Sequence, residues 1–88
     1  DNPKGALQEI IQSFSSEAPQ YQVLNATGPD HDRSFECAVF HLGQELGRGD
    51  GKSKKLAETK AAAAALDLLN LRGKPGMDPK AEKVDPAP

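Results

Sequence analysis

Lysines gather in one short stretch of this chain. Four of the eleven basic residues fall within nine positions: Lys52, Lys54, Lys55 and Lys60. Ser53 is a suitable N-cap, so a helix is expected to begin within this stretch. Lysine is unfavourable at a helix N-terminus because its charge opposes the positive end of the dipole, the end at which anions bind. The stretch therefore predicts an anion-binding surface.

The net charge of the chain does not contradict this expectation. Thirteen acidic residues slightly outnumber the eleven basic ones, which gives a formal charge of -2. Exposed charges are screened beyond about 8 Å at physiological salt, so the local distribution matters more than the sum. The acidic residues are scattered, and the lysine stretch forms a basic patch on a mildly acidic body.

A second set of polar groups lies on a helix predicted over residues 3–15. Asn2 is a good N-cap, and Pro3 suits the first helical position because its missing N–H has no partner there. The apolar residues recur at the spacing of one helical face, which we expect to be buried: Leu7, Ile10, Ile11 and Phe14. The opposite stripe carries hydrogen-bonding groups: Gln8, Glu9 and Gln12.

Three strands are predicted after this helix, over residues 20–26, 34–41 and 44–48. The first ends at a turn-rich segment marked by Gly28-Pro29. The second places Phe35, Cys37 and Val39 on one face by period-two alternation. The short connections favour an antiparallel meander, because parallel neighbours require long crossovers.

The end of the sheet and the second helix follow from glycine and alanine. Three alternate glycines are expected to break the third strand into a loop: Gly47, Gly49 and Gly51. A helix should start near Ser53 and end between Asn70 and Gly73. Its broad inward face consists mostly of alanine, which lets a helix lie close to a sheet: Ala57, Ala61, Ala62, Ala65, Leu66 and Leu69.

The order of these elements predicts an α+β fold. It is α-β-β-β-α, with two helices packed on one face of a three-stranded antiparallel sheet. We expect one domain over residues 1–71 and a disordered tail over residues 72–88, which is rich in proline and charge. With one cysteine, no signal peptide and no membrane span in view, a reducing cytoplasmic location is expected.

The motifs in this order resemble the double-stranded-RNA-binding domain family. The resemblance covers residues 3–70 and rests on LQEIIQ, APQY, GPDHDRSF, and GRGDGKSKK followed by LAETKAAAAAL. It implies a domain that binds an RNA duplex by its A-form shape, 2′-hydroxyls and phosphates, largely without regard to sequence. The implied contacts come from three regions: Gln8, Glu9 and Gln12; Pro29, Asp30 and His31; and Lys52, Ser53, Lys54 and Lys55.

A narrower resemblance is to the C-terminal module of bacterial ribonuclease III. Lys4 ahead of LQE, the GPDH motif and Glu58 in place of a family lysine carry it. The resemblance implies a parent endoribonuclease that processes RNA, and that works as a homodimer through a domain absent from this chain. A divalent metal such as Mg²⁺ would belong to that nuclease domain, so no cofactor and no catalytic residue is expected here, and the fragment itself is expected to be monomeric.

Three alternatives stay open from the sequence. The chain could belong to another RNA-processing protein, or it could be a dimerisation module of the same fold that does not bind RNA. It could also be an enzyme in which Cys37 pairs with a histidine, although its place between Phe35 and Val39 favours a core thiol. The lysine stretch superficially resembles a P-loop, but its spacing does not fit that motif.

Overall fold

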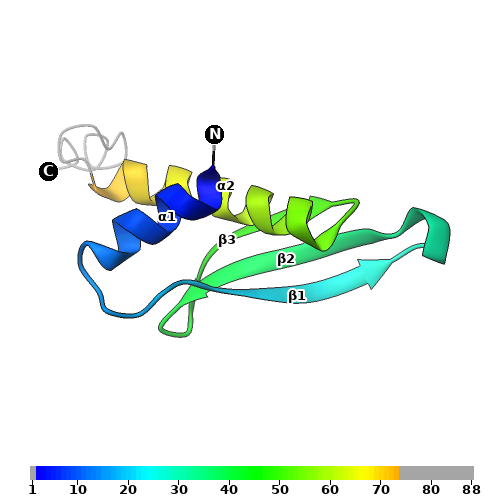
Figure 1. Cartoon of the computed structure of the whole chain (residues 1–88), viewed down its shortest axis with the longest axis horizontal. Helices are drawn as coiled ribbons and strands as arrows, with labels where there is room; N and C mark the ends of the chain where they lie inside the picture. Colours follow the sequence, from blue (N-terminus) through cyan, green and yellow to red (C-terminus); the bar gives the residue numbers. More distant parts are fainter. Residues whose placement is uncertain (1, 74–88) are drawn as a thin grey trace, which may run out of the picture.

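A computed structural model describes residues 2–73 of the chain, and only the backbone of residues 71–73. The elements are α1 (Pro3–Gln12), β1 (Gln20–Thr27), the short 3₁₀ helix η1 (Asp30–Asp32), β2 (Ser34–His41), β3 (Gln44–Gly51) and α2 (Lys54–Gly73). The strands form one antiparallel sheet in the order β1-β2-β3. Both helices lie on the same side of this sheet (Figure 1). The predicted fold class is confirmed.

The first helix begins as predicted and ends early. Asn2 accepts a hydrogen bond from Gly5 N at 3.2 Å. The helix stops at Gln12 rather than residue 15 because the Ser13 hydroxyl donates to Ile10 O at 2.6 Å and competes for the last turn. Phe14 therefore lies beyond the helix and is 62% exposed, so its predicted burial is wrong.

The third strand is longer than predicted, because the alternate glycines lie inside it rather than ending it. A Cβ built on Gly47 would lie 2.6 Å from Ala65 N, and one on Gly49 would lie 2.5 Å from Ala61 N. The backbone of α2 thus rests directly on β3, and only glycine leaves room for it. The expectation of a loop at these positions was wrong, since the glycines serve close helix–strand packing.

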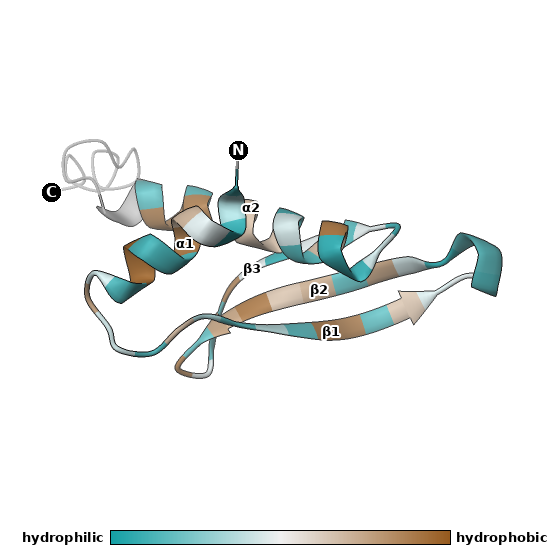
Figure 2. Cartoon of the chain, in the orientation of Figure 1, coloured by the Kyte–Doolittle hydropathy of each residue, from teal (hydrophilic) through white to brown (hydrophobic). Residues whose placement is uncertain are grey.

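The core lies where α1 and α2 meet the sheet. It consists of small and medium side chains, in keeping with the predicted alanine face of α2: Leu7, Ile11, Val39, Ala61, Ala62 and Ala65. The apolar part of β2 runs beneath the helices, whereas the β1–β2 loop is coloured as hydrophilic (Figure 2). None of the described helices is both long and apolar enough to cross a membrane.

The second helix ends within the range predicted for it, between Asn70 and Gly73. The second helix runs to Gly73, so it includes the first two residues of the segment 72–88 that was predicted to be a disordered tail. The remainder of that predicted tail, residues 74–88, lies outside the described residues. The predicted domain boundary stays a prediction.

Candidate nucleic-acid interface

The N-terminus of α2 presents its lysines to solvent. Ser53 is the N-cap, as predicted, because its Oγ accepts a hydrogen bond from Leu56 N at 3.1 Å. Lys54 and Lys55 occupy the first turn, and both are exposed. That turn holds no acidic residue. Among residues 2–73 neither lysine forms an ion pair, and both ammonium groups extend from the end of the helix whose dipole and amide groups favour anions.

The polar stripe of α1 is exposed as predicted. Gln8, Glu9 and Gln12 all face solvent. Gln8 Nε2 donates to Gln12 Oε1 at 3.3 Å, which aligns the two amides along the helix. An amide can both donate and accept, and a carboxylate can accept from a hydroxyl. The stripe can thus form hydrogen bonds with sugar hydroxyls and base edges.

The loop between β1 and β2 projects from the end of the sheet. Gly28 has a φ of 93°, and a Cβ there would lie 2.5 Å from Asp32 O, so the turn needs glycine. The loop continues through Pro29 into η1, where Asp30 and His31 are exposed. The sharp turn therefore holds η1, which contains the exposed His31, at one end of the molecule (Figure 1).

These three regions follow one another along the long axis of the molecule. In Figure 1, the start of α2 lies between α1 and the loop that contains η1. Two ion pairs connect the regions: Lys4 of α1 reaches Glu58 of α2, and Lys52 before α2 reaches Asp32 of η1. The α2 N-terminus is thus tied to both other regions.

The first of these ion pairs is the closer contact. Lys4 Nζ donates to Glu58 Oε1 at 2.6 Å and lies 4.8 Å from the centre of the Tyr21 ring. Glu58 is one turn beyond Lys54 on the same face of α2. Burial, and to a smaller extent the negative charge of Glu58, raises the pKa of Tyr21. Lys4 therefore joins α1, α2 and β1 in one contact.

This contact predicts a measurable coupling between the helices. We expect Lys4→Met and Glu58→Gln each to lower the free energy of unfolding by about 1 kcal/mol, since the pair is partly exposed and has a cation–π contact besides. The double variant should cost less than the sum of the two. Urea denaturation of the four proteins measures this, and strict additivity would show that the two side chains do not interact.

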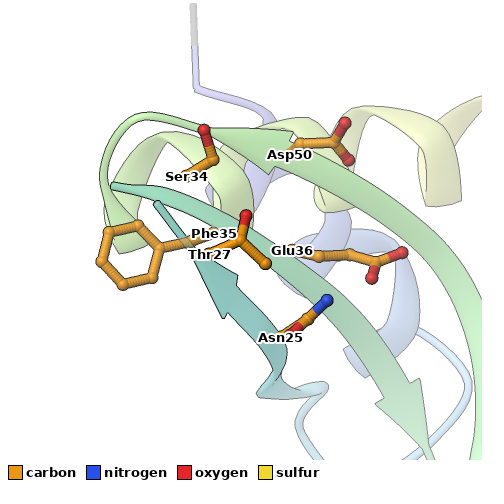
Figure 3. A pocket seen from close by; sticks show the side chains of 6 residues that line it. All are labelled: Asn25, Thr27, Ser34, Phe35, Glu36 and Asp50. Carbon is orange, nitrogen blue, oxygen red and sulfur yellow. The ribbon is translucent and has the colours of Figure 1, made fainter. Parts of the chain in front are cut away.

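The open face of the sheet carries carboxylates. Glu36 pairs with Asp50 across β2 and β3, and alternation places both opposite the face covered by α2. They line a hollow of about 280 Å³ together with Asn25 and neighbouring side chains (Figure 3). Arg48 lies between acids on this face, with its Nε 2.7 Å from Glu45 Oε2. Among these residues three carboxylates outnumber one arginine, so this part of the face is unfavourable for phosphates.

The cysteine has the environment of a core residue. Cys37 is fully buried, and its Sγ lies 4.0 Å from Lys54 O. Burial, with a smaller contribution from the charge of Glu58, raises the pKa of the Cys37 thiol. His41 instead lies 3.0 Å from Ser15 Oγ. Within residues 2–73 no hydrogen bond joins Cys37 to a histidine, and no three His, Cys, Asp or Glu side chains gather as a metal site.

Comparison with known proteins identifies this arrangement. The model of the family "Double-stranded RNA binding motif" matches residues 3–69, which include all three regions. The chain belongs to this family. As a double-stranded RNA binding motif, it is 38% identical to DRB4 dsRBD2 in a solution structure that superposes with a TM-score of 0.57, covering 76% of this chain and 93% of that one. It also resembles Dicer from Pichia stipitis, with a TM-score of 0.61 and 31% identity over 74% of this chain and 31% of that one.

Curated relatives of this double-stranded RNA binding motif include bacterial ribonucleases. Ribonuclease 3 of Lactococcus lactis subsp. cremoris is 54% identical over 67 residues, which cover 76% of this chain and 29% of that protein. Ribonuclease 3 of Wolinella succinogenes is 45% identical over 71 residues, which cover 81% of this chain and 30% of that protein. The chain spans less than a third of the length of these relatives.

The residues that connect the regions were not predicted from the sequence. The three predicted sets of contact residues lie one after another along the molecule, but no contact was predicted for Lys4, Asp32 or Glu58. Lys4 and Glu58 are 54 positions apart, and no local spacing rule signals a pair at that distance. The RNA contacts themselves stay a prediction.

Proposed function

We propose that this domain holds double-stranded RNA across successive grooves of the A-form helix. Domains of this kind span about 16 base pairs, with two minor-groove contacts and a contact to the intervening major-groove phosphates. The observation that carries the proposal is the order along the long axis, in which the lysine-bearing start of α2 lies between α1 and the β1–β2 loop (Figure 1).

Each region has the chemistry for its place on the duplex. The amides of Gln8 and Gln12 suit the 2′-hydroxyls and base edges of one minor groove, and Glu9 can accept from a hydroxyl. The Pro29–His31 loop reaches the second minor groove. Lys54 and Lys55 meet the phosphates between them. Because such contacts depend on backbone and shape, sequence has little influence on binding.

We further propose that the parent protein is a double-strand-specific endoribonuclease of the ribonuclease III type. Its relatives named Ribonuclease 3 support this, and each is more than twice as long as this chain. In this proposal the domain binds substrate as a non-catalytic monomer in the cytoplasm. The missing part supplies the nuclease site with its Mg²⁺ and the dimer contact. Cleavage assays and light scattering of the full-length protein test these points.

Duplex binding is tested by competition between RNA and DNA. A labelled RNA duplex of about 20 base pairs is long enough for one domain. We expect unlabelled RNA duplex of the same length to displace it at least tenfold more effectively than DNA duplex, because B-form DNA lacks 2′-hydroxyls and has different groove dimensions. EDTA should have no effect on binding by this domain. Equal competition by DNA would contradict the proposal.

A further inference from the structure

Lys52 differs from the other lysines at the start of α2 in having an acidic partner. Its Nζ lies 3.0 Å from Asp32 Oδ1 and 3.4 Å from Ser34 Oγ. In the part of the chain that the structure describes, Lys54 and Lys55 form no ion pair. Two lysines are thus free to meet a phosphate, and the third must leave a carboxylate to do so.

The pair lies between two of the proposed contact regions. Asp32 is the last residue of η1, and Lys52 follows β3 directly. Both side chains are well exposed, at 63% and 68%. They line a notch of about 320 Å³ with neighbouring residues of the loop: Asp30, His31, Arg33 and Phe35. A phosphate entering this notch can reach Lys52 from solvent.

The ion pair between Lys52 and Asp32 is weak enough for a well-placed phosphate to replace Asp32. Exposed ion pairs contribute little, equivalent to about fivefold or less in an equilibrium. When the other two regions hold the duplex, a phosphate already lies beside Lys52 and loses little further translational entropy on contact. It can therefore displace Asp32 at a small cost in free energy. A phosphate that is poorly placed gains too little to break the pair.

We propose that Asp32 makes Lys52 a conditional phosphate ligand and so sharpens the choice of RNA over DNA. This rests on the proposed duplex binding. On A-form RNA the three regions fit together and bring a phosphate to Lys52. On DNA the three regions do not fit together, and Lys52 stays paired with Asp32. One phosphate contact that would form equally well with RNA or DNA is therefore not made. Asp32 is thus a specificity-determining residue that acts through Lys52.

The test compares the salt dependence of binding to RNA and DNA duplexes of equal length. For Asp32→Asn, we expect DNA binding to tighten about two- to fivefold and its log–log salt slope to steepen by about 0.7 to 0.9, the value for one phosphate contact. The RNA slope should not change. Lys52→Met should lower the RNA slope by the same amount. In the Lys52→Met background, Asp32→Asn should leave the DNA slope unchanged.

Asp50→Asn is the matched control, because it removes the same charge from the open face of the sheet. We expect it to leave the RNA-to-DNA ratio and both slopes unchanged. An equal effect of Asp50→Asn and Asp32→Asn would overturn the proposal, because it would show that DNA binding depends only on the net charge of the domain. Weaker RNA binding by Asp32→Asn would also overturn the proposal, because it would show that the ion pair stabilises the loop in the conformation that binds RNA. A wild-type protein without RNA preference would instead contradict the proposed function.

Discussion

Gly49→Ala is expected to lower the free energy of unfolding by about 2 to 3 kcal/mol, the upper part of the usual cost of overpacking. A Cβ at this position would lie 2.5 Å from Ala61 N. The obstacle is helix backbone, so no rotamer change relieves it, and α2 must move away from β3. Small domains have total stabilities of only about 5 to 15 kcal/mol. Thermal and urea denaturation measure the loss.

Gly43→Ala is the control for this experiment. Gly43 has a φ of 81° in the β2–β3 turn, and a Cβ there would meet nothing within 4 Å. Its substitution costs only the backbone strain of the left-handed region, about 1 kcal/mol. A Gly49→Ala variant as stable as wild type would show that α2 does not rest on the third strand as described.

Removing both lysines from the first turn of α2 is expected to produce the largest loss of RNA binding. A hydrogen bond to a charged group contributes about 1.5 kcal/mol or more, so Lys54→Ala and Lys55→Ala should each weaken binding about tenfold. The double variant should lose about one hundredfold. Each substitution should also lower the salt slope by about 0.7 to 0.9, equally for duplexes of different sequence.

Lys60→Ala provides the matched control on the same helix. Lys60 is exposed but lies beyond the first turn, so its loss changes the net charge equally without removing a proposed contact. Titrations at several salt concentrations should show little change for this variant. The stability of the Lys54 and Lys55 variants should match or exceed that of wild type, because these charges oppose the helix dipole. An unchanged salt slope would remove both lysines from the interface.

Local rules were sufficient for most of the fold. The caps at Asn2 and Ser53 have geometry that depends on a few neighbouring residues, and both were predicted correctly. The alternation in β2 correctly predicted that strand, from Ser34 to His41. The errors arose where tertiary packing overrides local preference. Glycine normally disfavours a strand, but β3 needs three of them because a helix backbone lies against it.

The candidate site, like the fold, has features that local rules predict and features that depend on tertiary packing. The exposed positions of Gln8 and Lys54 followed from helical periodicity and capping. The ion pairs that fix the spacing of the regions could not be predicted, because they join residues far apart in sequence and depend on how the helices cross the sheet. Glu58 illustrates this: in the sequence it supports the resemblance to ribonuclease III, and only the fold shows that it contacts Lys4.

The central claim is that three separate regions engage one duplex at once. NMR chemical-shift mapping of the isotope-labelled domain with an RNA duplex of about 20 base pairs tests this most directly. We predict that amide signals of α1, of the β1–β2 loop and of the α2 N-terminus shift together along one binding curve, whereas Glu36 and Asp50 on the open face do not shift. Perturbations confined to one region, or centred on the open face, would contradict the claim.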